Sequence, residues 1–199
     1  YVSRSHPPDH ERGGVVTPHR EPDAPINSAD NSSLHPVELS AEELLRQCDV
    51  RKTKRSGPGG QHRNKVETAI VLTHQPTGIL AEASERRSQS ENLSIAVERL
   101  RIRLAVRVRS DVTAASPPSD LWRSRCKGEK IVISPSHADF PRLLAEALDR
   151  IAAAGWELKP AAEQLGCSPS QLLKLIKDEP TAWVLLQEER RRSGLHPLK

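Results

Sequence analysis

The sequence predicts an α+β fold, with a small mixed or antiparallel sheet and a long Arg-rich helix, followed by a small all-α domain. Three observations carry this prediction. Residues 68–74 and 79–84 alternate apolar and polar side chains, as half-buried strands do. Residues 91–109 place their apolar side chains on one helical stripe. From Phe140 onward, apolar residues recur at helical spacing in several short segments.

The first 39 residues form a Pro-rich segment with few large apolar side chains, which predicts a disordered arm over residues 1–39. Order is expected from Ser40, because Ser40 and Glu43 match a capping box and residues 41–47 suit a short helix. Val50 to Lys54 is the first predicted strand, and it leads into a Gly-rich loop. The chain therefore divides into an arm, a domain over residues 40–110, a linker over 111–135 and a helical domain over 136–199.

The two alternating segments are joined by Gln75-Pro76-Thr77-Gly78. Proline in the second place and glycine in the fourth suit a type I turn, so the segments are predicted to form a β-hairpin. Residues 99–109 alternate like a strand, but the apolar stripe extends back through ENLSIAVE, where alternation fails. A helix is therefore preferred, with its apolar stripe on the hairpin and its arginines turned outward.

The linker contains Ser116-Pro117-Pro118-Ser119, and Lys130 to Ser134 could add one strand. A helix from Phe140 to about Gly155 comes next, then short helices over 160–165 and 169–177 and a last helix through Trp183 to Arg192. The two short helices around Gly166 are spaced like a helix-turn-helix. The segment QLLKLIK has only two lysines with which to read base edges, so a plain helical bundle is preferred over a DNA-binding unit.

Charge and cysteine content restrict the partners. The net charge is only +4, but residues 51–65 contain six lysines and arginines and no acid. Such a local basic patch is expected where a chain binds phosphate. The three cysteines have no zinc-ligand spacing, which argues against a metal site or a disulfide framework and favours a reducing, cytoplasmic setting. No apolar run is long enough for a membrane span, and the absence of Met suggests a fragment or a processed form.

Four sequence elements occur in the order of a known family: the basic lead-in, GPGGQHRNK, THQPTGI and RRSQSEN. Together they resemble the catalytic domain of class I peptide chain release factors, and most of all the ribosome-rescue peptidyl-tRNA hydrolases and release-factor-like proteins. The resemblance covers about residues 48–109. It implies hydrolysis of the ester between a nascent peptide and tRNA inside the large ribosomal subunit, with no metal and no cofactor.

The resemblance also implies roles for individual residues. The backbone amide of Gln61 would stabilise the oxyanion, Gly59 and Gly60 would hold a conformation that side chains forbid, and the Gln61 side chain would place water. His62 is a candidate general base by its ordinary pKa, but a packing or RNA-contact role is preferred. Residues expected to contact rRNA or tRNA are Lys52, Lys54, Arg55, His62, Arg63, Lys65, Arg86, Arg87 and Gln89. For Gln89, helix capping is the alternative.

The expected partners are the rRNA of the large subunit and peptidyl-tRNA, with no membrane and a monomer off the ribosome. Release factors that read stop codons carry a codon-reading domain with a PxT or SPF tripeptide, and nothing before Ser40 resembles one. Codon-independent peptide release is therefore the predicted function. The alternatives are a ribosome-binding module that keeps the loop without catalysis, and a DNA-binding regulator led by the helical C-terminal part.

Overall fold

The computed structural model describes residues 26–27, 34–53, 68–113 and 115–199. Three short sheets are present in this part of the chain, and their strands are β1 (Ile26–Asn27), β2 (Cys48–Thr53), β3 (Ala69–His74), β4 (Ile79–Ala83), β5 (Val108–Arg109), β6 (Cys126–Lys127) and β7 (Lys130–Ile131). The helices are η1 (Pro36–Glu38), α1 (Ala41–Arg46), α2 (Gln89–Arg107), α3 (Asp120–Arg125), α4 (Phe140–Ala153), α5 (Leu158–Leu165), α6 (Pro169–Lys177) and α7 (Pro180–Arg192). The α+β fold class predicted from sequence is confirmed.

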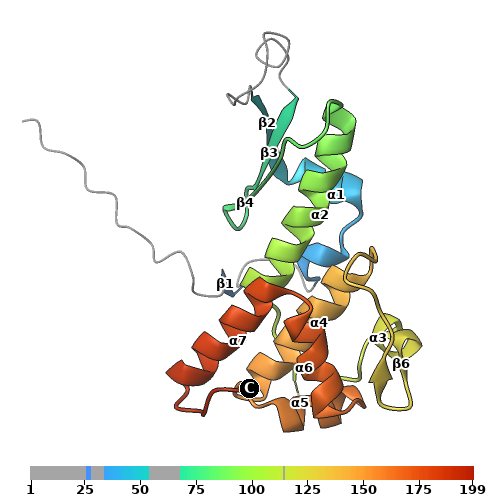
Figure 1. Ribbon diagram of the computed structural model, residues 1–199, viewed down its shortest axis with the longest axis vertical. Coiled ribbons are helices and arrows are strands. Elements are labelled where there is room, and N and C mark those ends of the chain that lie inside the picture. Colours follow the sequence, from blue (N-terminus) through green and yellow to red (C-terminus); the bar gives the residue numbers. More distant parts are fainter. Residues whose placement is uncertain (1–25, 28–33, 54–67, 114) are drawn as a thin grey trace, which may run out of the picture.

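The central sheet is antiparallel, with the order β2–β3–β4. Alternation works as predicted: Ile70 and Leu72 on β3, and Ala81 and Ala83 on β4, are buried beneath α2, which crosses this face (Figure 1). The β3–β4 connection lies over Gln75–Gly78, where Gly78 has φ 70°. The closing hydrogen bond runs from the Gly78 N–H to the His74 carbonyl at 2.7 Å, one residue wider than in the predicted type I turn.

Helix α2 is the predicted Arg-rich helix, but its arginines do not simply face solvent. Arg99 donates to the carbonyl of Glu82 at 2.7 Å, and Arg103 donates to the carbonyl of Leu80. Both carbonyls belong to β4, the outer strand of the sheet, whose free edge these side chains cover. Arg101 turns the other way and donates to the carbonyls of Val37 and Leu39 at 2.7 and 2.6 Å. The arginine row therefore joins α2 to its neighbours.

Several segments outside the predicted elements are ordered. Within the arm predicted to be disordered, Ile26–Asn27 form β1, which pairs in parallel with β5. Residues 34–39, assigned to the disordered arm, contain the helix η1, and Val37 is fully buried in the core beside α2. Residues 120–125, assigned to the linker, form α3, capped by Ser119 and anchored by the buried Trp122. The strand expected over 130–134 is shorter, and it pairs with β6 in a two-stranded ladder. Residues 34–39 and 120–125 carry buried side chains, Val37 and Trp122, that a periodicity argument does not detect.

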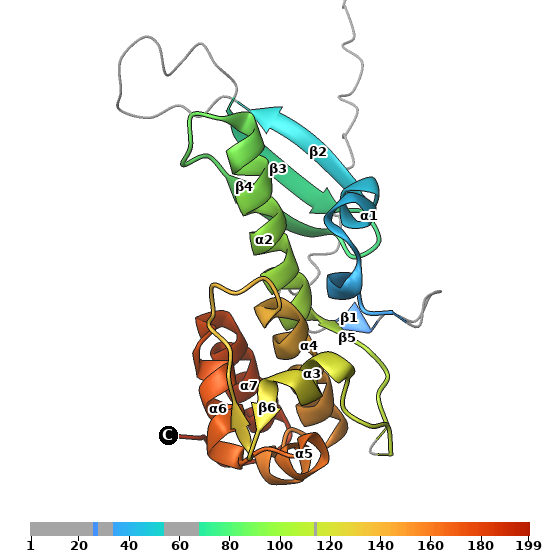
Figure 2. The ribbon, with the colours of Figure 1, turned by 90° about the vertical axis from the view of Figure 1, so that its right-hand side faces the viewer.

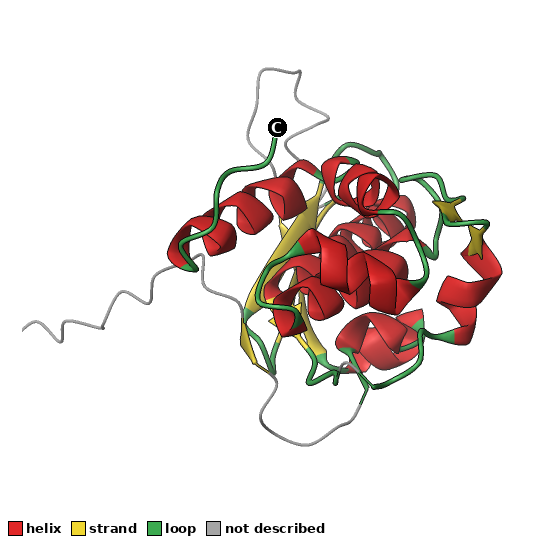
Figure 3. Ribbon diagram, turned by 90° about the horizontal axis from the view of Figure 1, so that it is seen from below, coloured by secondary structure: helices red, strands yellow, loops and turns green. Residues whose placement is uncertain are grey.

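The C-terminal helices α4–α7 form the predicted all-α part, and they lie at the opposite end of the long axis from the tip of the β2–β3 pair (Figures 1 and 2). Helix α4 packs against α2, and the buried side chains of both regions belong to one continuous cluster. Viewed along the long axis, these helices stand in front of the central sheet (Figure 3). Among the described residues, no helix has both the length and the apolar composition needed to cross a membrane.

Candidate functional site at the end of the central sheet

The end of the β2–β3 ladder frames the segment that carries the sequence motif. Thr53, the last residue of β2, is paired with Ala69, the first residue of β3. Residues 54–67 therefore connect two strand ends that lie side by side at the same end of the sheet. The predicted catalytic residues and most of the predicted RNA contacts lie outside the described residues: Lys54, Arg55, Gly59, Gly60, Gln61, His62, Arg63 and Lys65.

The other four predicted contact residues lie at this same end of the sheet. Lys52 is exposed on β2 and stands in one row with Ile70 of β3 and Ala83 of β4. Arg86 and Arg87 are exposed in the turn that follows β4, and Gln89 is the first residue of α2. Because neighbouring strands lie about 5 Å apart, the row brings Lys52 to within roughly 10 Å of the strand that leads into the arginine turn. The fold thus gathers cations around the ends of the 54–67 segment.

The N-terminus of α2 is capped by Ser88, whose hydroxyl accepts a hydrogen bond from the Glu91 N–H at 3.5 Å. Gln89 follows the cap, so the cap itself is Ser88, and the alternative role suggested for Gln89 from sequence belongs to its neighbour. Three residues later, Asn92 is fully buried, with its amide bonded to both Thr68 and Arg86. Asn92 was not among the predicted site residues. The signal available in the sequence was its place as the last residue of the RRSQSEN element.

The opposite end of the hairpin is fixed by a second polar network. His74 is buried, with its Nδ1 2.7 Å from the Thr77 hydroxyl and its Nε2 3.0 Å from the Gln47 side-chain oxygen. Burial lowers the pKa of His74, which favours a neutral ring that bridges two hydrogen-bonding partners. The THQPTGI element therefore has a structural explanation in the turn, at the far end of β3 from the 54–67 segment.

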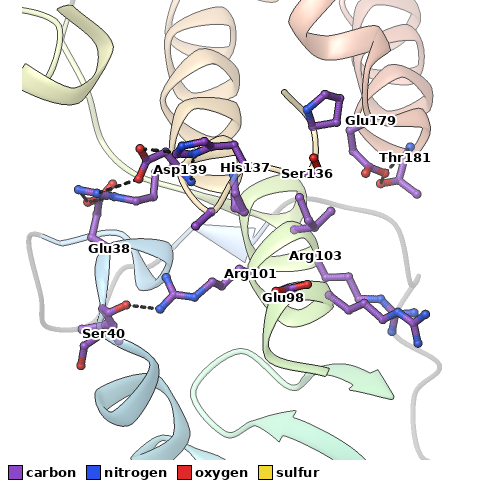
Figure 4. Close-up of a pocket in the computed structure, with 17 residues that line it drawn as sticks. Glu38, Ser40, Glu98, Arg101, Arg103, Ser136, His137, Asp139, Glu179 and Thr181 are labelled. Atoms are coloured by element: carbon purple, nitrogen blue, oxygen red, sulfur yellow. Dashed lines mark hydrogen bonds and ion pairs between the residues drawn. The ribbon is translucent and has the colours of Figure 1, made fainter. Parts of the chain in front are cut away.

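A cleft of about 810 Å³ lies elsewhere, between η1, α2, the loop before α4 and the start of α7 (Figure 4). None of the predicted site residues lines it. Among its lining charges, Arg142 Nε lies 2.7 Å from Glu38, whereas Arg101 donates to the carbonyls of Val37 and Leu39. We interpret this cleft as the seam between the sheet domain and the helical part, because its lining comes from both sides.

The predicted helix-turn-helix spacing corresponds to α5, Gly166 and α6, with Gly166 in a left-handed conformation at φ 65°. The two lysines of α6 already have partners within the chain. Lys174 lies 2.9 Å from the Asp178 carboxylate, and Lys177 donates to the Lys199 carbonyl at 2.7 Å while covering the ring of Trp183. A helix whose cations are engaged in this way is poorly suited to read DNA, which favours the plain helical bundle.

The fold and the site define a small α+β domain that presents a basic, Gly-rich segment between two adjacent strands. Residues 40–130 match the sequence model of the RF-1 domain family. Peptide chain release factor 1 of Leptothrix cholodnii is 38% identical over 91 residues, which make up 46% of this chain and 23% of that protein. Peptide chain release factor 2 of an Acidovorax species is 44% identical over 70 residues, or 34% of this chain and 19% of the relative. The chloroplastic release factor PrfB1 of Arabidopsis thaliana is 43% identical over 70 residues, or 35% of this chain and 14% of the relative.

Residues 40–130 therefore match the RF-1 domain, and the relatives that share this stretch are named as peptide chain release factors, which supports the resemblance drawn from the sequence elements. The match continues to residue 130, beyond the boundary expected at residue 110, and so includes α3 and β6. The chain spans about a fifth of the length of the curated relatives it matches. Helices α4–α7 lie outside the matched residues.

Proposed function

We propose that this protein hydrolyses the ester bond of peptidyl-tRNA in the large ribosomal subunit, with residues 54–67 as the segment that enters the reaction centre. One observation carries the proposal: the RF-1 domain holds both ends of this segment on paired strands, and it surrounds them with exposed cations. A segment fixed at both ends loses less conformational entropy on docking than a free chain does. RNA is the expected partner because phosphate is attracted by the lysine and arginine side chains.

The proposed chemistry needs an oxyanion donor more than a protein base. Water attacks the ester carbonyl carbon, and the π electron pair moves onto the carbonyl oxygen. That pair then returns as the bond to the ribose oxygen breaks, and the ribose oxygen takes up the proton that the attacking water loses. In this proposal the backbone N–H of Gln61 donates to the developing oxyanion, while Gly59 and Gly60 permit the backbone to approach it. A preorganised donor of this kind contributes a factor of about 10²–10³ to the rate.

The RNA contacts in this proposal are made to phosphate and backbone groups. Residues 41–121 contain no Phe, Tyr or Trp, so stacking of bases on aromatic rings has no partner in this stretch. The described cations at the sheet end, Lys52, Arg86 and Arg87, are exposed and can reach phosphates on either side of the 54–67 segment. Such contacts predict ribosome binding that weakens steeply with salt.

We further propose that peptide release is independent of a stop codon and occurs on stalled ribosomes. The support for this is the resemblance of the GPGGQHRNK element to the ribosome-rescue members of the family. The basic C-terminal residues do not form a free tail: Gln187 donates to the Leu198 carbonyl at 2.8 Å, and Arg190 donates to the His196 carbonyl at 2.9 Å. In this proposal, the folded surface of α4–α7 recognises the stalled ribosome.

The test is single-turnover peptide release from purified ribosomes that carry peptidyl-tRNA, with a stop codon, a sense codon or no mRNA in the A site. Wild type is compared with Gly60→Ala and with Gly57→Ala, which makes the same chemical change in the same segment outside the predicted catalytic set. Release in all three ribosomal states that is lost in Gly60→Ala and kept in Gly57→Ala supports the proposal. Release only at stop codons contradicts the rescue role and leaves termination.

Two substitutions at Gln61 separate the backbone from the side chain. Gln61→Ala keeps the backbone N–H, whereas Gln61→Pro removes it. We expect the proline variant to release peptide about 10²–10³ times more slowly than wild type, and the alanine variant to lose less. If no protein releases peptide while ribosome binding is intact, the enzyme proposal fails and the docking module remains.

A further inference from the structure

The side chain of Asn92 is a buried junction between α2, the sheet and the arginine turn. Asn92 lies on the first turn of α2 and is fully buried. Its Oδ1 accepts a hydrogen bond from the Arg86 N–H at 2.9 Å. Its Nδ2 donates to the carbonyl of Thr68 at 2.6 Å and to the carbonyl of Arg86 at 2.9 Å. One side chain thus satisfies three backbone groups in two separate segments.

This set of contacts requires an amide. A carboxamide supplies one acceptor oxygen and two N–H donors in one plane, which matches one N–H and two carbonyls. An aspartate in the same place would accept from Arg86 but would direct a carboxylate toward two carbonyl oxygens. A leucine of similar shape would leave all three groups without a partner. Because the position is buried, unmatched groups there are costly, and the arrangement is specific to asparagine.

The two segments joined by Asn92 are those on which the proposed reaction depends. Thr68 is the residue immediately before β3, where the 54–67 segment rejoins the sheet. Arg86 and Arg87 form the exposed part of the turn between β4 and α2. The hydrogen bonds from Asn92 fix the distance and orientation between these two points. They also tie both points to α2, the longest helix among the described residues.

We propose that Asn92 is a positioning residue for peptide release. It touches neither substrate nor RNA. It acts through Thr68 and Arg86, by fixing the start of β3, which follows the 54–67 segment, relative to the arginine turn. This inference rests on the proposed function, because its effect is on the rate of peptide release. Small displacements of reacting groups cost large factors in rate, so loss of this register should lower the rate constant far more than the affinity.

The experiment compares wild type with Asn92→Ala and Asn92→Asp in single-turnover peptide release, with the protein titrated against a fixed amount of ribosome complex. We expect the maximal rate constant to fall by at least about 10-fold in both variants, with the half-saturating concentration within about 3-fold of wild type. Val97→Ala removes a buried apolar group from the same helix and serves as the matched destabilised control. It should keep the wild-type maximal rate wherever it is folded.

The pH profile separates positioning from general loss of structure. A carboxyl buried against two carbonyl oxygens has a raised pKa, and its protonated form carries an O–H that can donate to one of them. The ratio of Asn92→Asp to wild-type rates should therefore rise as the pH falls from about 8 to about 5.5, whereas the ratio for Asn92→Ala should stay flat. Amide hydrogen exchange at Arg86 should be faster in Asn92→Ala than in Val97→Ala, because the acceptor of that N–H is gone.

Each result has a distinct reading. Wild-type release rates in folded Asn92→Ala overturn the positioning role and leave the proposed function intact. Equal losses in Asn92→Ala and Val97→Ala at equal stability overturn it too, because they assign the effect to folding. If wild type itself releases no peptide, the proposed function fails, and the positioning role fails with it.

Discussion

The two ends of α2 are built from different chemistry. At the N-terminal end, exposed arginines stand beside a single buried amide, Asn92, and the backbone groups it holds belong to short segments open to solvent. At the C-terminal end, the chain is buried among apolar side chains and a buried ion pair. Arg109, which follows α2, lies with its Nη1 3.0 Å from Asp149 of α4, and both side chains are about nine-tenths or more buried.

The N-terminal end of α2 therefore carries hydrated charges, and its C-terminal end is attached to the helical part of the protein. Cations at the N-terminal end keep their water, and under the proposed function they exchange it for RNA phosphate. Charges at the C-terminal end have lost their water and depend on each other. Burial raises the pKa of Asp149 to about 6 against the opposing effect of Arg109, and burial lowers the pKa of Arg109 to about 10. Both groups are therefore charged at pH 7, and the pair joins the RF-1 domain to the helical part.

Removing one partner of this pair should have the largest effect on stability. In Asp149→Ala, the Arg109 guanidinium stays buried without its counter-charge. We expect the free energy of unfolding to fall by about 3–5 kcal/mol, the typical cost of removing one partner from a buried ion pair. Chemical denaturation followed by circular dichroism measures it. The matched control is the double variant Arg109→Met, Asp149→Leu, which removes both charges and should recover most of the loss. A double variant as unstable as the single one would show that the charges themselves, and not their balance, hold the two parts together.

The stabilisation by His35, at the C-terminal end of α2, is expected to depend on pH. Its Nδ1 accepts from the Val37 N–H at 3.2 Å, and its Nε2 lies 3.2 Å from the Val108 carbonyl, an arrangement that requires a neutral ring. Burial lowers the pKa of His35 from 6.5 to about 4; the hydrogen bond with the Val108 carbonyl opposes this shift, and nearby Arg109 contributes to it. Because the folded pKa is depressed, the stabilisation is complete above pH 6.5 and is lost as the pH falls through 6.5 toward 4.

The size of this effect follows from the shift in pKa. A difference of this magnitude corresponds to about 2–4 kcal/mol in the free energy of unfolding. Asp149 works in the opposite direction over the same range, because its folded pKa is raised and its contribution is lost as the pH rises from about 4 to about 6. Comparing wild type with His35→Gln at each pH isolates the histidine. Their difference should shrink by that amount between pH 7 and pH 4; a constant difference would contradict a neutral buried ring.

The sheet and the helix around the N-terminal end of α2 were largely predictable from sequence, whereas the attachment at its C-terminal end was not. Alternation in residues 68–74 and 79–84 predicted which side chains the sheet buries, such as Leu72 and Ala81, because period and burial are local properties. The RRSQSEN and GPGGQHRNK elements predicted the RF-1 domain. Residue roles within 54–67 stay predictions. The attachment depends on pairs such as Arg109 with Asp149, forty residues apart, and no local pattern marks such partners.

Two further elements show the same limit. Val37 lies in a short Pro-rich stretch where no sequence period was identified, yet its side chain is buried in the core beside α2. Trp122 follows Pro117 and Pro118, which indicated a linker; the helix α3 forms there because Ser119 caps it and the indole N–H donates to the Leu165 carbonyl at 2.8 Å. Both segments are ordered by distant partners, and tertiary contacts override local composition in each.

The smallest expected effect on stability comes from substitutions beside the N-terminal end of α2. Arg86 and Arg87 are exposed, and changing both to alanine should alter the free energy of unfolding by no more than about 0.5 kcal/mol. The same double variant should bind ribosomes more weakly and with a shallower dependence on salt, because up to two phosphate contacts are lost. Sedimentation with ribosomes over a range of KCl concentrations measures the slope, and Arg46→Ala, an exposed arginine on α1, is the matched control. An unchanged slope in the double variant would show that Arg86 and Arg87 do not contact RNA phosphate. The turn that Asn92 holds would then have a structural role only.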